Sequence, residues 1–235
     1  AYQSRGLGDV YKRQSEYHGW MEYGGGQQLK DRIYGEYGLK ALNCLTHAPE
    51  TSGWFRKKIN NVEELKGMKM RFFGLGAMVM SKLGVSTQLL AGGDIYPALE
   101  KGVIDATEFS MPTHDLSYGF YQLAKFNYFP GWHQQTSIGE LLLNQKAWNG
   151  ITKTQQGIIK TSCDATMLWA LVRSDAKQVP AMRELEKKGV TFVTWPDSEI
   201  SKFTFKPRDF NSLTNTLKDS GIPASKSSSP LIIAS

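Results

Sequence analysis

The sequence predicts an α/β fold, in which short strands and helices alternate along a chain of 235 residues. Three observations predict it. Apolar runs with strand character alternate with segments of helical periodicity. Glycine ends several of the helical segments, as at Gly84 and Gly102. The hydrophobic fraction of 40% is enough for a substantial core. Alternation of this kind favours parallel pairing of the strands.

The first expected elements are a helix and a strand near the start of the chain. Residues 27–37 are amphipathic, and Gly38 follows them as a C-terminal cap would. Residues 39–45 are expected to form a short strand. The next segment, THAPETSG over residues 46–53, contains proline and small residues and is expected to be a loop.

The middle of the chain repeats the alternation. Asn61 and Glu64 form a capping-box pair that opens a short helix. Asp94 is expected to cap a later helix, which tolerates Pro97 in its first turn. In chain order the elements expected here are a short helix from residue 61, a strand over 69–73, a helix over 76–83, a strand over 86–90, a helix over 94–101 and a strand over 104–108.

A long helix dominates the second half of the chain. Thr152 and Gln155 form another capping box, and helical periodicity continues to about Lys188. Pro180 should break or kink this helix because proline lacks an amide hydrogen. The strands on either side of it are expected at residues 137–143 and 190–194.

The net charge of +6 does not indicate a nucleic-acid partner. Residues 1–14 carry three basic residues and one acidic residue, and residues 205–235 carry four and two. The part between them has 21 basic and 19 acidic residues. A protein that follows a phosphate backbone concentrates Lys and Arg on one face, so we expect no such partner. No run of about 18 apolar residues is present, so no membrane span is expected.

Both ends of the chain differ from the rest. Residues 9–14, DVYKRQ, match the translation of a common sequencing-library adapter, and we expect residues 1–14 to be an artefact outside the fold. Residues 205–235 lack helical or strand periodicity and form a doubtful tail. The alternative for the tail is a natural Ser-rich terminus.

Reactive side chains form no standard catalytic motif. Cys44 and Cys163 are far apart and are expected to be two buried thiols. The four histidines lack metal-binding spacing. His47 and Glu50 share a loop, which leaves a zinc hydrolase as an alternative. No GxSxG motif is present to support nucleophilic catalysis.

The segment GLGAMV at residues 74–79 has some likeness to a dinucleotide-binding turn. It follows an expected strand and opens an expected helix, and Asp94 lies 20 residues beyond Gly74. Val79 occupies the place of the third glycine, however, so the match is incomplete. The alternative is a tight turn between strand and helix.

Arg71 and Glu108 are the most informative charged residues. Arg71 lies within the apolar run MKMRFF, where an unpaired charge is costly. A guanidinium can grip a ligand carboxylate through two hydrogen bonds. Glu108 ends a neighbouring strand, and ligands of open α/β sheets lie at the carboxyl ends of strands. The alternatives are an Arg at the exposed end of an edge strand and a Glu satisfied by a helix N-terminus.

Four segments together resemble the substrate-binding proteins of tripartite ATP-independent periplasmic (TRAP) transporters. They are GMKMRFFGLGAMVMSKLG, GGDIYPALEKGVIDATEF, FNYFPGWHQQTS and LLLNQKAWNGIT. The resemblance runs from about Trp20 to Ser201. It is closest to the branch that binds 2-oxo and 2-hydroxy monocarboxylates with a metal ion.

The resemblance implies a two-domain fold of the periplasmic-binding-protein kind, with a ligand cleft between two α/β domains. Residues 15–48 and 135–175 would belong to the first domain. Residues 49–134 and 176–204 would form the second. The resemblance also implies that the family's first part, with its signal peptide, is missing from this chain.

The resemblance also implies a set of site residues. The carboxylate-clamping arginine of the family matches Arg71, and its metal-ligand acid and the following aromatic residue match Glu108 and Phe109. Two departures involve PETSGWF and PGWHQ: Glu50 stands where the family has glutamine, and Gln134 stands where it has glutamate. The pair would still supply one carboxylate and one amide.

The expected substrate contacts are Arg71, Glu50, Phe109 and Trp132. The expected metal ligands are Glu108, Phe109, Gln134 and Glu50, around a sodium or calcium ion that bridges the substrate.

The function implied is that of a periplasmic solute-binding protein without enzymatic activity. It would deliver a small carboxylate to the membrane subunits of a TRAP transporter, and a homodimer is a further expectation. The first alternative is a stand-alone carboxylate-sensing domain of the same fold. A nucleotide-dependent enzyme that uses the turn at Gly74 is the second.

Overall fold

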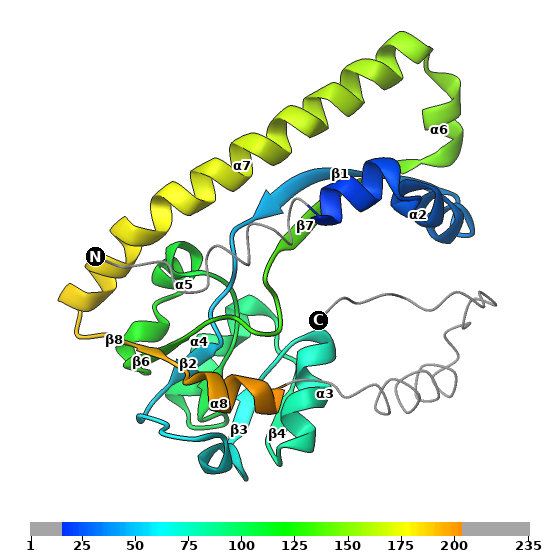
Figure 1. Ribbon diagram of the computed structural model, residues 1–235. Coiled ribbons are helices and arrows are strands. Elements are labelled where there is room, and N and C mark those ends of the chain that lie inside the picture. The colour runs from blue at the N-terminus through cyan, green and yellow to red at the C-terminus, as the bar shows by residue number, and fades with distance from the viewer. Residues whose placement is uncertain (1–15, 204–235) are drawn as a thin grey trace.

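The computed structural model describes residues 16–203, which build two separate sheets (Figure 1). The smaller sheet pairs β1 (Leu39–His47) with β7 (Ser137–Asn144) in antiparallel fashion. The helices of this region are α2 (Gly26–Gly35), α6 (Gln145–Gly150) and α7 (Lys153–Lys187). Both α2 and α7 contact β1. The long helix α7 continues beyond the small sheet and also contacts α5 (Pro112–Tyr118) of the other region.

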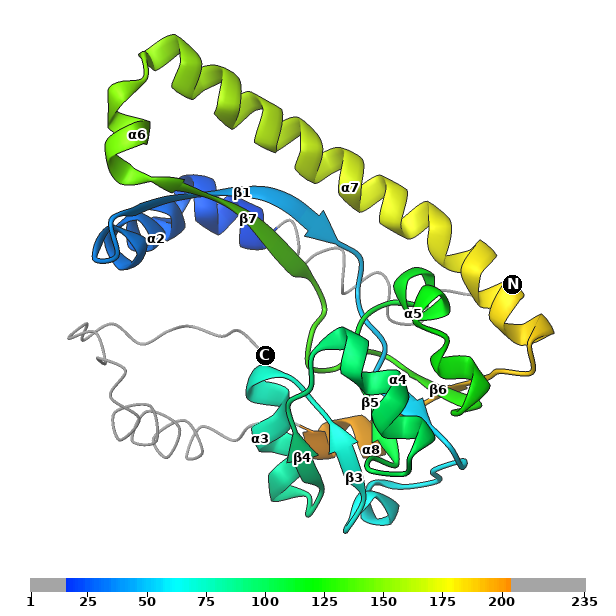
Figure 2. The same cartoon turned by 180° about the vertical axis from the view of Figure 1, so that it is seen from behind.

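The larger sheet has six strands in the order β4-β3-β5-β2-β6-β8. Its strands are β2 (Gly53–Phe55), β3 (Lys69–Arg71), β4 (Ser86–Gln88), β5 (Ala106–Thr107), β6 (Phe126–Phe129) and β8 (Thr191–Thr194). Around it lie α3 (Gly74–Lys82), α4 (Gly92–Glu100), α5 (Pro112–Tyr118), α8 (Asp197–Ile200) and the short 3₁₀ helices η1 (Val62–Leu65), η2 (Phe120–Gln122) and η3 (Ser201–Phe203) (Figure 2).

The α/β class is confirmed, and the expected parallel pairing holds on both sides of the larger sheet. β3 pairs in parallel with β4 and β5, and β6 pairs in parallel with β8. β2 is antiparallel to both of its neighbours. Sequence periodicity does not predict β2, because a strand of three residues is too short to show alternation.

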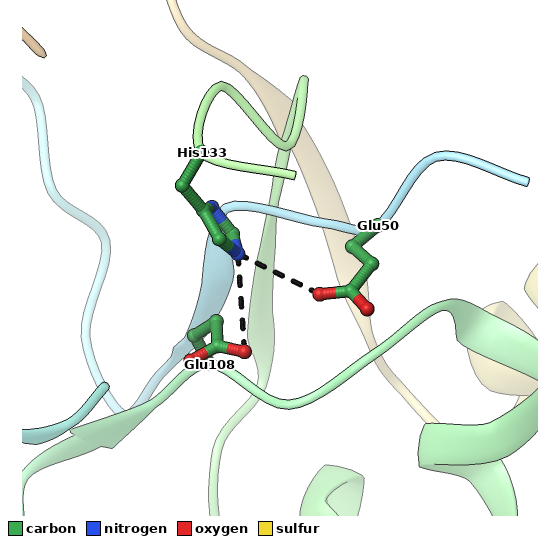
Figure 3. A group of neighbouring side chains, drawn as sticks. All are labelled: Glu50, Glu108 and His133. Carbon is green, nitrogen blue, oxygen red and sulfur yellow. Dashed lines mark ion pairs between the residues drawn. The ribbon is translucent and has the colours of Figure 1, made fainter. Parts of the chain in front are cut away.

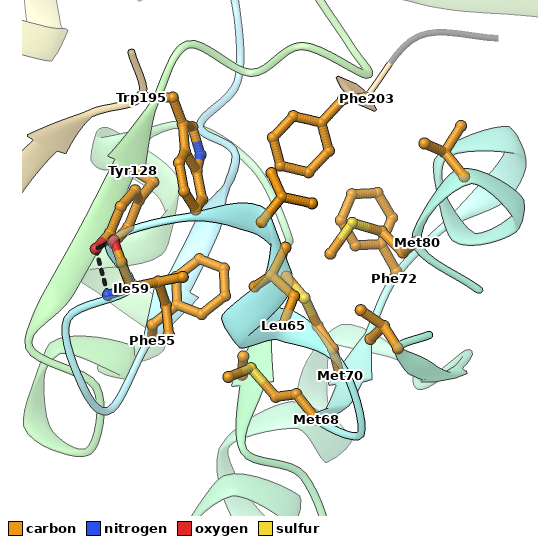
Figure 4. Packing of buried hydrophobic residues seen from close by; sticks show 14 residues of the cluster. Phe55, Ile59, Leu65, Met68, Met70, Phe72, Met80, Tyr128, Trp195 and Phe203 are labelled. Atoms are coloured by element: carbon orange, nitrogen blue, oxygen red, sulfur yellow. Dashed lines mark hydrogen bonds between the residues drawn. The ribbon is translucent and has the colours of Figure 1, made fainter. Parts of the chain in front are cut away.

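Two hydrophobic clusters cover opposite faces of the larger sheet. Successive side chains of a strand point to opposite faces, and β2 shows this directly. Trp54 packs in one cluster and Phe55 in the other. We call the cluster that contains Phe55 the aromatic core (Figure 4); it also includes Phe72, Tyr128, Trp195 and Phe203.

The predictions for Asp94, Pro97 and Pro180 differ from what the structure shows in α4 and α7. Asp94 lies inside the first turn of α4 rather than at its N-cap, which is Ala91. Pro97 therefore falls beyond the first turn. Pro180 does not break the long helix, because α7 is one continuous helix of 35 residues. Contacts of α7 with both β1 and α5 hold the helix along its length and offset the loss of one backbone hydrogen bond.

The prediction of two free thiols is wrong. Cys44 of β1 and Cys163 of α7 form a disulfide although they lie 119 residues apart. The pairing of β1 with β7 shifts register between Asn43 and Leu45, so Cys44 sits in a β-bulge. Sequence spacing could not predict this pairing, because the strand and the helix meet only in the folded chain.

The predicted domain boundaries stay a prediction, although the two sheets divide the described residues in a similar way. Residues 1–14 and 205–235, expected to be an artefact and a doubtful tail, lie outside the described residues. None of the helices within residues 16–203, α7 included, combines the length and apolar character that a membrane span requires.

Candidate functional site

The site is built where the chain crosses between the two sheets. Residues 48–52 connect β1 to β2, and residues 130–136 connect β6 to β7. The two crossings touch, since the Glu50 amide donates to the Gln134 carbonyl at 3.2 Å. A Cβ at Gly131 would lie 2.2 Å from the Glu50 carbonyl oxygen. Only glycine permits this approach, which brings the turn PGWHQ against Glu50.

Glu108 directly follows β5 and is 2% exposed. Its Oε2 accepts hydrogen bonds from Arg71 Nη1 at 2.9 Å and from the Phe73 amide at 3.0 Å. Phe73 is the N-cap of α3, so the alternative in which a helix N-terminus satisfies Glu108 is realised for this oxygen. Oε1 points elsewhere, toward His133.

Glu50 is also buried, and only one of its two carboxylate oxygens accepts hydrogen bonds from the described residues. Its Oε1 accepts from Gln134 Nε2 at 2.8 Å and from Ser137 Oγ at 3.3 Å. Its Oε2 is buried and has no hydrogen-bond partner among the described residues. A buried carboxylate oxygen without a donor is costly, which indicates that another group belongs beside it.

His133 lies between the two carboxylates (Figure 3). Its Nε2 is 3.6 Å from Glu50 Oε2 and 3.8 Å from Glu108 Oε1. Its side chain is 4% exposed, and within residues 16–203 neither ring nitrogen has a hydrogen-bond partner. One ligand atom from each of the three residues lies within 4.8 Å of the others. We call Glu50, Glu108 and His133 the carboxylate–histidine cluster.

Burial and the two carboxylates act in opposite directions on the pKa of His133. Burial lowers the pKa of its imidazole, but the attraction of Glu108 and Glu50 outweighs burial and raises the pKa above its ordinary value.

Aromatic packing positions the imidazole of His133. Its ring makes edge contacts with Phe72 at 4.8 Å and with Trp132 at 5.2 Å between ring centroids. A Cβ at Gly76 would lie 2.4 Å from the Phe72 ring and 3.1 Å from the His133 Cβ. The second glycine of GLGAMV therefore makes room for these two side chains, which favours the tight-turn interpretation of that motif.

A third buried carboxyl group is Asp115 of α5, which contacts Trp54 of β2. Trp54 Nε1 donates to its Oδ2 at 2.7 Å, and its Oδ1 has no hydrogen-bond partner among the described residues. Burial raises the pKa of Asp115 well above its usual range, and the charges of Glu50 and Glu108 add to that effect.

The remaining predicted residues lie close to the cluster but differ in what they contact. Arg71 is 7% exposed and lies on an interior strand, which excludes the alternative of an Arg at the exposed end of an edge strand. Its Nε donates to the Leu90 carbonyl, and its guanidinium lies 5.4 Å from the Phe109 ring centroid. Trp132 stacks on Phe72 and Phe203 in the aromatic core.

Sequence reasoning missed His133 as a member of the site. The four histidines lack metal-binding spacing in the sequence, but the fold places His133 beside two carboxylates from distant segments. The available signal was the position of His133 in PGWHQ, directly before the predicted ligand Gln134. His47, which shares a loop with Glu50, instead has its ring 5.5 Å from that of His114.

The cluster fits a cation in part. Two buried carboxylates that each turn one oxygen to a common point suit a hard ion such as calcium or sodium. The orphan Oε2 of Glu50 supports such an ion. The imidazole of His133 is not a ligand that these ions prefer, since they take oxygen donors.

The sequence comparisons identify a family. Residues 10–207 match the sequence profile of the bacterial extracellular solute-binding proteins, family 7 (DctP). A curated relative from Nostoc sp., named monocarboxylate 2-oxoacid-binding periplasmic protein all3028, is 38% identical over 178 residues. The match covers 76% of this chain and 49% of that protein, so the chain spans about half the relative's length.

Solved structures give the same result. A TRAP transporter solute-binding protein from Bordetella bronchiseptica, a mixed-occupancy dimer with calcium and picolinate, is 33% identical with a TM-score of 0.78 and covers 87% of this chain and 60% of that one. A second, from Colwellia psychrerythraea with calcium and pyruvate, is 31% identical with a TM-score of 0.75. The match covers 88% of this chain and 61% of that one. A third, from Pseudoalteromonas atlantica with sodium and pyruvate, is 29% identical with a TM-score of 0.76, and the match covers 88% of this chain and 62% of that one.

The predicted resemblance is confirmed by the profile and by these relatives. The chain belongs to the bacterial extracellular solute-binding proteins of family 7, the TRAP transporter solute-binding proteins.

Proposed function

We propose that this chain forms part of a periplasmic receptor that binds a small 2-oxo or 2-hydroxy monocarboxylate together with a cation and delivers it to the membrane subunits of a TRAP transporter. The single observation that carries the proposal is the pair of buried carboxylates, Glu50 and Glu108, each with one oxygen turned toward the same point. An anionic ligand can bind beside them only if a cation offsets the repulsion.

The surroundings of this pair support a carboxylate ligand. Arg71 adds a buried guanidinium whose Nη2 makes no hydrogen bond to any described residue, so it can donate to a ligand oxygen. Phe109 covers one side of the guanidinium. Relatives that hold pyruvate with calcium or sodium favour the same ligand class here. The roles of Arg71, Phe109, Trp132 and Gln134 in binding are part of the proposal.

Location and lack of catalysis are also proposed. The Cys44–Cys163 disulfide suits an oxidising compartment such as the periplasm. Close packing at Gly76 argues against a nucleotide at the GLGAMV turn, so an enzyme that uses this turn is disfavoured. Titration with NAD tests that alternative, and neighbouring genes for transporter membrane subunits distinguish transport from stand-alone sensing. Gel filtration tests the expected homodimer.

The main test is a thermal-shift screen of the chain with pyruvate and lactate, in calcium, in sodium and in chelator. A ligand at about 100 times its Kd stabilises a protein by about 2.7 kcal/mol, which for this size corresponds to about 5–10 °C in Tm. Acetate, which lacks the 2-oxo or 2-hydroxy group, is the matched control and should shift Tm less. The absence of any shift with either acid, in any ion, would refute the proposal.

A further inference from the structure

We infer that His133 is a metal ligand, and that the carboxylate–histidine cluster prefers a divalent transition-metal ion such as Zn²⁺ or Co²⁺ to the calcium and sodium found in the relatives. The three protein ligands would be His133 Nε2 and one oxygen each of Glu50 and Glu108.

The distances within the cluster favour a shared ion over direct contact. A protonated histidine bonded to a carboxylate lies about 2.7–2.9 Å from it. The two His133–carboxylate distances, 3.6 and 3.8 Å, are longer than that. Two ligands of one ion with bonds of about 2.0–2.2 Å lie roughly 3.0–3.8 Å apart, depending on the angle between them. Both His133–carboxylate separations fall within this second range, and the three ligand atoms all lie within 4.8 Å of one another.

The state of the hydrogen-bonding groups points the same way. His133 is buried, yet neither of its ring nitrogens has a partner among residues 16–203. Each of the two carboxylates that face it is oriented by a hydrogen bond to its other oxygen. Arg71 donates to Glu108 Oε2, and Gln134 donates to Glu50 Oε1. Metal ligands are typically oriented in this way by a second layer of hydrogen bonds. The cluster therefore has the form of a prepared ligand set.

The chemistry of the donors selects the ion. Imidazole suits zinc, nickel and copper, whereas calcium and sodium take oxygen ligands. Imidazole and carboxylate are both ligands of zinc, and catalytic zinc sites hold the ion with three protein ligands and keep a fourth position open. If the proposed function holds, an oxygen of the carboxylate ligand would occupy that position. Only this last point, the ligand oxygen in the open position, rests on the proposed function. Metal binding by His133, Glu50 and Glu108 does not.

The experiment titrates metal alone into the tag-free, chelator-treated chain, with no carboxylate present. Calorimetry should give Zn²⁺ and Co²⁺ affinities at least about 100-fold above that for Ca²⁺, because a nitrogen donor favours the borderline ions. The visible absorption of bound Co²⁺ reports the ligand type independently of affinity. His133→Gln exchanges the nitrogen for an amide oxygen and should weaken Co²⁺ binding at least tenfold and change its spectrum, while Ca²⁺ binding changes little.

His18→Gln is the matched control, since His18 lies outside the cluster and contacts Thr46. It should leave metal affinity and the cobalt spectrum unchanged. Circular dichroism and Tm confirm that both variants are folded.

Two results would overturn the inference. One is a Ca²⁺ affinity equal to or above that of Co²⁺ in the parent chain. The other is a Co²⁺ spectrum that His133→Gln does not alter, as expected if protonated His133 replaces a metal. A separate carboxylate titration distinguishes the two proposals. Carboxylate binding with calcium and no transition-metal preference removes only this inference, whereas metal binding through His133 without carboxylate binding removes only the proposed function.

Discussion

The carboxylate–histidine cluster and the aromatic core are neighbouring buried regions that treat polar atoms differently. In the aromatic core, the Tyr128 hydroxyl accepts from the Ile59 amide at 2.6 Å and donates to the Ile59 carbonyl at 2.7 Å. In the cluster, one Glu50 oxygen and both His133 nitrogens have no partner among the described residues.

Burial of an unpaired polar atom costs about 1–3 kcal/mol, so a fold that served only stability would not keep three together. Trp195 Nε1 is a single such atom in the core. The unpaired atoms indicate that the cluster is arranged to bind a further group, whereas the polar atoms of Tyr128 are satisfied within the aromatic core. Phe72 belongs to the core and contacts His133, and so joins the two regions.

The largest expected effect comes from removing this shared residue. Phe72→Ala leaves a cavity under β3 and should lower the free energy of unfolding by about 3–5 kcal/mol. It also removes the edge contact that positions His133, so metal affinity should fall as well. Urea denaturation and metal calorimetry measure the two effects. Phe73→Ala is the control, because Phe73 is 55% exposed and its loss should change stability by less than about 0.5 kcal/mol. If both variants lost the same free energy of unfolding, the placement of Phe72 in the buried core and of Phe73 at the surface would be contradicted.

The second effect concerns the charged boundary of the cluster. Arg71→Lys keeps the charge but loses the planar guanidinium, whose Nη1 donates to both the carbonyl and the carboxylate of Glu108 and whose Nε donates to the Leu90 carbonyl. Hydrogen bonds to charged groups contribute about 1.5–3 kcal/mol each, so carboxylate affinity should fall at least about tenfold. Calorimetry with pyruvate measures it. Unchanged affinity would show that Arg71 only supports Glu108 and does not touch the ligand.

The contrast between the regions also explains what could be predicted from sequence. Local signals were sufficient for single elements. The Thr152–Gln155 capping box is present in both directions, and Glu108 stands at the end of its strand as expected. Each of these depends on residues a few positions apart, where spacing alone fixes geometry.

Features assembled from distant segments could not be predicted in this way. The cluster draws on three loops around residues 50, 108 and 133, and no spacing rule connects them. The same holds for the disulfide across 119 residues. The family resemblance supplied Glu50 and Glu108 but not His133, although His133 directly precedes the predicted ligand Gln134.

The third prediction sharpens the account of charge within the cluster. Gln134 Nε2 donates to Glu50 Oε1, so the two side chains form one amide–carboxylate pair. Glu50→Gln removes a charge and sets two amides against each other, which should weaken metal and carboxylate binding. Adding Gln134→Glu restores one carboxylate and one amide and should recover part of the affinity, with a coupling of about 0.5–3 kcal/mol. Calorimetry of the four proteins in this cycle measures the coupling. A double variant that binds no better than Glu50→Gln would exclude such compensation.

The smallest expected effect tests whether Asp115 belongs with the cluster or with the core. Burial raises the pKa of Asp115 in the folded chain above its unfolded value, so the folded state holds this proton more tightly. The stability that the protonated group provides is complete below the unfolded pKa of about 3.9 and is lost as pH rises toward the folded pKa. Asp115→Asn remains neutral and keeps an oxygen for Trp54, so it should melt higher than the parent at pH 7 and approach it at pH 5. Each 1 kcal/mol corresponds to about 2–4 °C in Tm.

The Asp115 measurement is made in chelator, so that no metal ion changes the field of Glu50 and Glu108. Asp94→Asn, on the exposed first turn of α4, is the control and should show no such trend with pH. If Asp115→Asn melts lower than the parent at pH 7, the carboxylate is ionised in the fold and has a partner there. Asp115 would then resemble Glu50 and Glu108 in being an ionised carboxylate that can contact a bound cation. If the variant melts higher, Asp115 behaves as a core residue, and the ionised carboxylates of this region are those that face His133.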